Sequence, residues 1–133
     1  MKTLAIVFLV CLAANVAEAR LICPAGLHPA MTAELFFGAD IPGGGRISDA
    51  DWNQFLAAEV TPRFPDGLTT WNAEGRWRTP AGVQTHESSR VLLLVLSGQG
   101  GGRAKLDALM AAYKRRFHQL SVGLVEHRDC AEF

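Results

Sequence analysis

The chain has 133 residues, of which 49% are hydrophobic and 20% are charged, and its 13 basic residues balance 13 acidic ones. This length fits one domain with a modest hydrophobic core. The balanced charge excludes an overall electrostatic field that would attract nucleic acid or an acidic surface. Composition therefore indicates one ordinary globular domain, excludes nucleic acid as an expected partner, and identifies no other partner.

The first 19 residues are typical of a secretory signal peptide. Lys2 precedes an apolar run at residues 4–14, and residues 17–19 form a small-x-small cleavage signal. The apolar run is about half the roughly 20 residues that a membrane-spanning helix needs. We therefore expect cleavage before Arg20 and no stable membrane anchor.

The expected mature chain, residues 20–133, is a single domain of 114 residues in the periplasm or the extracellular medium. A lipid anchor at Cys11 is the disfavoured alternative. Residues 8–10 place a branched side chain where bacterial lipoprotein signals have a small one.

Two cysteines remain in the mature chain, Cys23 and Cys130, near its opposite ends. An oxidising compartment favours a disulfide between them. The alternative is a tetrahedral metal site in which both cysteines act together with His28 and His127. We favour the disulfide, and we expect neither a metal ion nor another cofactor.

The periodicity of apolar residues predicts an α+β domain. One helix is expected from its cap at Ser48 or Asp49 to Val60. The apolar stripe of a second helix consists of Leu106, Leu109, Met110, Tyr113 and Phe117. Strands are expected at residues 33–38, 68–71, 76–79, 90–97 and 122–127.

The stretch from Thr61 to Arg78 is rich in proline, glycine, tryptophan and arginine. Pro62 is expected to end the first helix. A three-residue hairpin loop with Gly75 in the left-handed conformation would place Trp71 opposite Trp77. The two tryptophans and Arg63 then remain as candidates for ligand binding.

The order of the expected elements matches the split βαβ arrangement of ferredoxin-like sandwiches. In this fold an antiparallel sheet has two helices on one face, and here an extra hairpin follows the second strand. We expect strands 33–38 and 90–97 to be central and parallel to each other. The last strand would pair antiparallel with the first, which would bring Cys23 and Cys130 together.

Four stretches are similar to the bacterial domain-of-unknown-function family 3574. They are ELFFG at residues 34–38, TPRFPDGLT at 61–69, SRVLLLV at 89–95 and YKRRF at 113–117. The family-like core covers about residues 33–127. The resemblance implies a small exported protein without an assigned activity, so it identifies no catalytic residue.

The strand expected at residues 90–97 is apolar on both faces from Val91 to Leu96. A strand with one face in water alternates between apolar and polar residues. Phe36 likewise points away from its neighbours Leu35 and Phe37. If the helices cover one face of the sheet, the other face needs a cover: the chain's own hairpin and tail, a second copy of the protein, or an apolar or aromatic ligand.

The preferred function is a noncatalytic periplasmic binding or interaction module, with a homodimer through the sheet face as its expected assembly. Phe36, Arg63, Trp71 and Trp77 are the candidate residues for an apolar or aromatic ligand.

A small enzyme is the alternative. Glu34 shares its strand face with Phe36, and we expect it to form an ion pair with Arg90. A secluded Glu34 carboxylate would act as general acid or base on a hydrophobic substrate, with Arg63 or Arg90 as its electrostatic partner.

Two other classes of site are disfavoured by local sequence. Residues 86–89 contain acid, base and hydroxyl side chains, but neighbours on a strand point to opposite faces and cannot form a triad. The glycine-rich stretch at residues 97–105 lacks the spacing and the Lys-Ser/Thr pair of a phosphate-binding loop.

Overall fold

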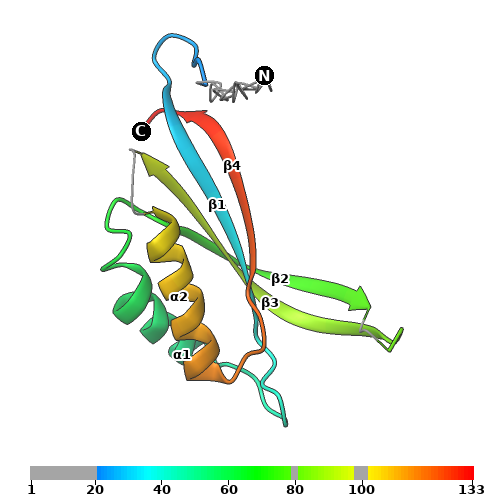
Figure 1. Cartoon of the computed structure of the whole chain (residues 1–133). Coiled ribbons are helices and arrows are strands. Elements are labelled where there is room, and N and C mark those ends of the chain that lie inside the picture. The colour runs from blue at the N-terminus through cyan, green and yellow to red at the C-terminus, as the bar shows by residue number, and fades with distance from the viewer. Residues whose placement is uncertain (1–20, 79–80, 98–101) are drawn as a thin grey trace, which may run out of the picture.

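The computed structural model describes residues 21–78, 81–97 and 102–133, so the expected signal peptide lies outside the described residues. Its helices and strands follow in the order shown in Figure 1: β1 (His28–Gly38), α1 (Asp49–Phe55), the π-helical turn η1 (Leu56–Val60), β2 (Thr69–Arg78), β3 (Gln84–Ser97), α2 (Gly102–Phe117) and β4 (Gly123–Ala131).

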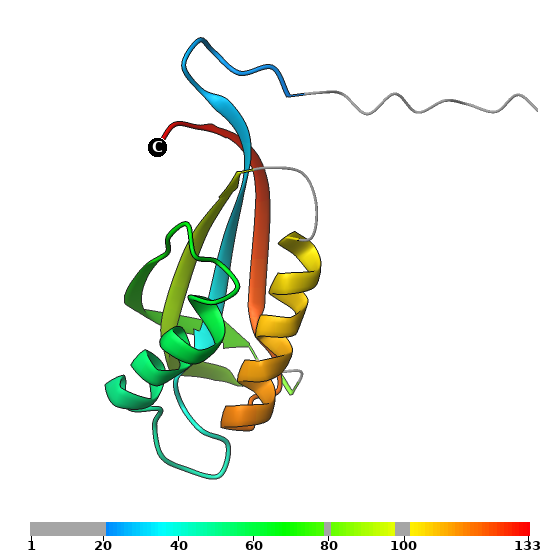
Figure 2. The same ribbon diagram turned by 90° about the vertical axis from the view of Figure 1, so that its left-hand side faces the viewer.

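The four strands form one sheet in the order β2-β3-β1-β4. Both helices lie on the same side of the sheet in the two perpendicular views (Figures 1 and 2). The predicted α+β, ferredoxin-like architecture is confirmed. The predicted pairing of the last strand with the first is also confirmed, because β4 lies antiparallel to β1.

The central strands β1 and β3 are antiparallel, so the expectation that they are parallel is wrong. The physical reason is the connection between the strands. The crossover through α1 makes β1 and β2 parallel, whereas β3, which follows β2 after a short connection, pairs antiparallel with it. Because β3 lies between β1 and β2, it is antiparallel to both.

The extra hairpin expected after the second strand does not form within the described residues, because β2 runs without interruption from Thr69 to Arg78. Gly75 lies inside the strand opposite Glu87, and its backbone is not in the left-handed region. Trp71 and Trp77 therefore do not oppose each other. They pair with Val91 and Thr85 of β3, lie six residues apart on one strand, and point to the same face.

Helix α1 begins at its predicted cap. The Ser48 hydroxyl accepts a hydrogen bond of 3.1 Å from the backbone N–H of Asp51. Trp52 and Phe55 on the following turns are buried. The helix continues into the π-helical turn η1, where the N–H of Thr61 donates to the carbonyl of Leu56 at 2.9 Å.

Aromatic side chains fill the core between the sheet and the helices. Phe37 of β1 packs against Tyr113 of α2 with ring centroids 4.5 Å apart, and Tyr113 lies 4.8 Å from Phe117. Phe55 of α1 contacts the same three rings. The Tyr113 hydroxyl donates a hydrogen bond of 2.9 Å to the carbonyl of Gly38, so its polar end is satisfied inside the core.

Cys23 and Cys130 form a disulfide, with 5.6 Å between their Cα atoms. Cys130 lies near the end of β4, opposite Pro29 of β1. The predicted bridge is confirmed, and it removes both thiolates from the alternative metal site. Within the described ranges, no helix is long and apolar enough to span a bilayer.

Candidate functional site

The sheet face turned away from the helices, called the open face below, is rich in apolar side chains. The strand pairing places Phe36 in a row with Val91 and Trp71, and it places Leu93 and Val125 on either side of Glu34. This group of five apolar residues is called the apolar patch. Phe36 is 40% exposed, Trp71 43% and Val125 41%, whereas Val91, which lies between Phe36 and Trp71 in the row, is only 1% exposed.

Farther along β2, Trp77 lies on the same face and is 48% exposed. The β2 strand lies within the sheet and not across it, so the chain's own hairpin does not cover the open face. Of the four predicted ligand-binding residues, the structure thus brings Phe36, Trp71 and Trp77 to one face.

Glu34 lies at the centre of the apolar patch and is half-buried. Its neighbours in the pairing are Leu93 of β3 and Val125 of β4, both apolar. Within the described part of the chain, its carboxylate forms no hydrogen bond or ion pair. The apolar patch therefore surrounds a carboxylate, that of Glu34, which has no protein partner among those residues.

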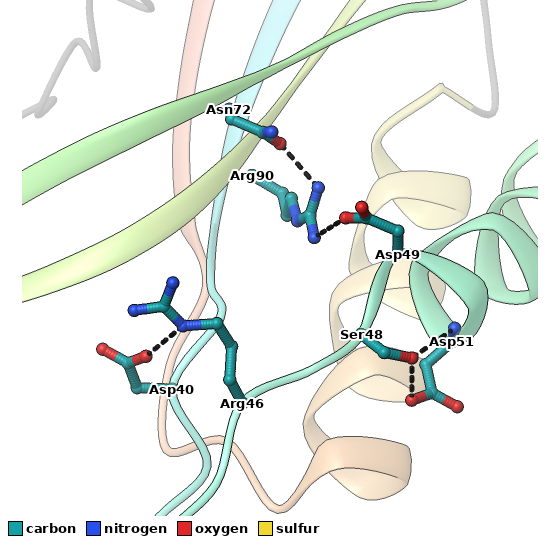
Figure 3. A network of polar contacts seen from close by, with 7 residues as sticks. All are labelled: Asp40, Arg46, Ser48, Asp49, Asp51, Asn72 and Arg90. Atoms are coloured by element: carbon teal, nitrogen blue, oxygen red, sulfur yellow. Dashed lines mark hydrogen bonds and ion pairs between the residues drawn. The ribbon is translucent and has the colours of Figure 1, made fainter.

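Arg90 lies on the other side of the sheet, so the expected Glu34–Arg90 ion pair is wrong. Its register partner on β1 is Phe37, whose side chain faces the helices. Figure 3 shows the Arg90 guanidinium between Asn72 and Asp49: it donates to Asn72 Oδ1 at 2.6 Å and forms an ion pair with Asp49. Because alternate residues on a strand point to opposite faces, Arg90 is directed away from Glu34.

Arg63 belongs to the helical layer. Its guanidinium forms an ion pair of 2.7 Å with Glu59 of η1 and also donates to the backbone carbonyl of that residue at 2.6 Å. The structure therefore does not bring Arg63 to the face that holds Phe36, Trp71 and Trp77.

A family model with the description "Protein of unknown function (DUF3574)" matches residues 32–133. The chain belongs to this family. The match confirms the resemblance seen in the sequence, and the description assigns no activity. No curated protein matches the chain.

Two kinds of solved structure share the fold of this DUF3574 domain. A phage SAM lyase in complex with S-methyl-5'-thioadenosine has a TM-score of 0.60 at 16% sequence identity, with 86% of this chain and 94% of that chain covered. CutA from Synechococcus elongatus has a TM-score of 0.53 at 10% identity, with 81% of this chain and 87% of that chain covered. At such identities the likeness shows the fold alone.

The helix side of the DUF3574 domain contains a polar groove that the sequence did not predict. It has a volume of about 720 Å³ and lies between the start of α1 and strands β2 and β3. Its charged side chains are already paired: Arg90 with Asp49, Arg46 with Asp40 at 3.2 Å, and Glu74 with His86 at 3.1 Å. The groove therefore offers hydrogen-bonding groups, and each of its charged side chains already has a protein partner.

Glu87 of β3, which pairs with Gly75 of β2, has a carboxyl group with a raised pKa. Burial raises the pKa of Glu87, and the nearby negative charge of Asp40 raises it further. The carboxylate lies directly over Gly38, where an added Cβ would be only 2.0 Å from Glu87 Oε1. Glycine at position 38 thus leaves the space that the Glu87 side chain occupies.

Proposed function

We propose that this protein is a noncatalytic binding module whose open face binds an apolar or aromatic ligand with a positively charged group. The single observation behind the proposal is the apolar patch with the half-buried carboxylate of Glu34 at its centre. Contiguous exposed apolar surface of this kind is typical of interaction sites.

The carboxylate favours a cationic ligand for an electrostatic reason. A purely apolar ligand would cover Glu34 and remove water from its charge without replacing the lost hydrogen bonds, which costs free energy. An ammonium or guanidinium group would compensate that loss, while the rest of the ligand covers Phe36, Trp71 and Val125. A negatively charged ligand would meet both desolvation and repulsion.

The homodimer through the sheet face is less well supported than a ligand on this face. By strand alternation, the titratable side chains of the described open face are the acidic residues Glu34, Glu87 and Asp129 and the histidines His28 and His127. Packing two such faces together would bring negative charges close to each other. We therefore assign the open face to a ligand.

The enzyme alternative retains Glu34 but lacks the partners that it requires. Arg63 is paired with Glu59, and Arg90 is paired with Asp49 on the other side of the sheet. With both arginines paired elsewhere, Glu34 lacks the electrostatic partner that the enzyme alternative assigned to it. We therefore place the acid/base role of Glu34 second.

We also propose that the protein is exported and that residues 1–19 are its signal peptide. The disulfide between Cys23 and Cys130 supports this proposal, because such bridges persist in oxidising compartments. The periplasm or the extracellular medium is the expected location.

The binding proposal is tested with two probes that have the same eight-carbon tail and opposite charge, octylammonium and octanoate. Calorimetric titration should show that octylammonium binds more tightly. Glu34→Gln should weaken octylammonium binding by roughly fivefold, the equivalent of about 1 kcal/mol, and should remove most of the preference over octanoate.

Matched variants separate the contribution of the apolar patch to probe binding from the contribution of the Glu34 charge. Phe36→Ser should weaken both probes by roughly tenfold, since it removes exposed apolar area from the patch. Leu120→Ser, which changes a side chain that is 90% exposed outside the strands, should weaken neither. Tighter binding of octanoate, or equal effects of the Phe36 and Leu120 variants, would refute the proposal.

A further inference from the structure

We infer that a second copy of the chain pairs antiparallel with the outer edge of β2, about a two-fold axis at Glu74. This interface uses the edge of the sheet and does not depend on ligand binding to the open face. It is inferred from three features of β2: an outer half that pairs only with β3, an edge without proline or bulge, and the symmetry of its side chains.

The outer half of β2 belongs to a two-stranded arm. Strand β3 pairs with β1 only from Ser89 to Ser97, whereas β2 and β3 pair along their length to Arg78 and Gln84. The carbonyl of Ser88 still accepts a hydrogen bond of 2.8 Å from the N–H of Ala39, but beyond it residues 75–78 and 84–87 pair only with each other. Figure 1 shows this arm projecting away from both helices. An isolated two-stranded hairpin is marginally stable in water, so a further strand at its edge would stabilise it.

The edge of β2 lacks two common devices that prevent pairing with another chain. It contains no proline, and its ladder with β3 runs from Thr69 to Arg78 in constant register, without a bulge. It is also the last strand on its side of the sheet. Half of its backbone N–H and C=O groups therefore point outward and are available to a strand of a second copy.

The side chains of β2 on the open face are symmetric about Glu74. They follow the order Trp71, Ala73, Gly75, Trp77, which is large, small, small, large. In an antiparallel pair centred on Glu74, each Trp71 lies opposite Trp77 of the second copy, and each Ala73 lies opposite Gly75. Cross-strand aromatic pairs stabilise such ladders, and here they would also cover tryptophans that are 43% and 48% exposed.

The opposite side of β2 is complementary in charge under the same symmetry. The two Glu74 residues meet at the axis, and each has Arg76 of the other copy as its diagonal neighbour, about 7–8 Å away between backbones and within reach of long side chains. His86 already contacts Glu74 at 3.1 Å from β3. Two arginines and two histidines thus surround two glutamates, while Asn72 lies opposite Arg76.

This pairing produces a closed dimer. The two four-stranded sheets would join through their β2 strands into one continuous sheet, and the same surface of each copy would be used. Of the apolar patch, only Trp71 lies on β2 and would contact the second copy; Phe36, Leu93 and Val125 lie on the other three strands and would remain free beside Glu34.

Charge exchange tests the pairing on the full mature protein with its disulfide intact. Sedimentation equilibrium over the micromolar range should show a dimer for the wild type. Glu74→Arg and Arg76→Glu alone should each raise the dimer Kd by roughly tenfold or more, because each makes the diagonal contacts like-charged. The double variant should return the Kd to within about threefold of the wild type, because the opposite charges are restored.

Cross-linking tests the register. Residues directly opposite on antiparallel strands have Cα atoms about 4.5–5.5 Å apart, which suits a disulfide. Under mild oxidation Glu74→Cys should therefore form a covalent dimer with its own symmetry mate, whereas the matched variant Thr70→Cys should not.

A monomeric wild type, or charge variants that leave the dimer unchanged, would overturn the inference. Efficient cross-linking of Thr70→Cys with none of Glu74→Cys would do the same. Phe36→Ser should leave the Kd of the dimer unchanged, so failure of this interface is distinguishable from failure of ligand binding at the apolar patch.

Discussion

Glu34 and Arg90 show how strand direction decides which residues meet. Both were expected on one face, on the assumption that β1 and β3 are parallel. The antiparallel register puts Arg90 opposite Phe37, which points into the core, and leaves Glu34 between Leu93 and Val125. The alternation of Leu35, Phe36 and Phe37 depends only on strand geometry, and it was predicted correctly.

At the residue scale, Glu87 makes the stability of the fold depend on pH. Its pKa is raised in the folded protein by burial and by Asp40. A folded-state pKa above the ordinary value means that the native state binds more protons than the unfolded state between the two values. Stability should therefore fall as the pH rises from near 4.5, the ordinary value, through the raised pKa.

Urea unfolding at several pH values between about 4 and 8 checks this sign. Glu87→Gln should be relatively more stable than the wild type at the higher pH, and the difference should shrink at the lower pH. Glu132→Gln changes the same charge at an exposed position and is the control. A wild type that gains stability over Glu87→Gln as the pH rises would contradict the expectation.

At the scale of elements, the error at the hairpin has a specific cause. Gly75 between two tryptophans indicated a tight turn, because glycine is the usual residue at left-handed turn positions. In the structure Gly75 has extended backbone and pairs with Glu87, and the chain reverses only after Arg78. Local sequence could not distinguish a turn glycine from a strand glycine, since the difference lies in the partner strand.

Helix α1 begins at the cap that the sequence predicted, and the contribution of this cap to stability can be tested. The hydroxyl of Ser48 accepts the N–H of Asp51, so Ser48→Ala leaves this N–H without its cap. The variant should lose about 1 kcal/mol of unfolding free energy, measured by urea denaturation. Ser48→Asp is the matched control, because its carboxylate can cap the helix again, and equal losses in both variants would show that capping is not the cause.

At the scale of the whole molecule, the disulfide closes most of the domain. Cys23 and Cys130 are 107 residues apart in the sequence. In the chain-entropy model, a loop on the order of 100 residues corresponds to about 4–5 kcal/mol of stabilisation. The Cys23→Ser/Cys130→Ser variant should therefore unfold at a much lower urea concentration than the oxidised wild type.

Reduced wild type is the control for the disulfide, since it removes the bridge without changing the side chains' size. It should unfold at a urea concentration close to that of the double variant, and a loss of unfolding free energy below about 1 kcal/mol in both would contradict the expectation.

Export is tested with the full chain, expressed with its own N-terminus and recovered from the periplasm. The mass of the recovered protein should correspond to a chain that begins at Arg20.

The sequence alone determined the features that depend on local periodicity and on residue type. These are the α+β class, the stripe of α2, the cap of α1, the two-sided apolar strand at residues 91–96 and the cysteine pair. Tertiary structure decided the rest: the direction of β3 relative to β1, the continuity of β2 through Gly75, and the separation of Glu34 from Arg63 and Arg90. The physical reason is that alternation along a strand determines which residues of that strand share a face. Which residues of other strands lie beside them depends on the direction and register in which strands distant in the sequence pair.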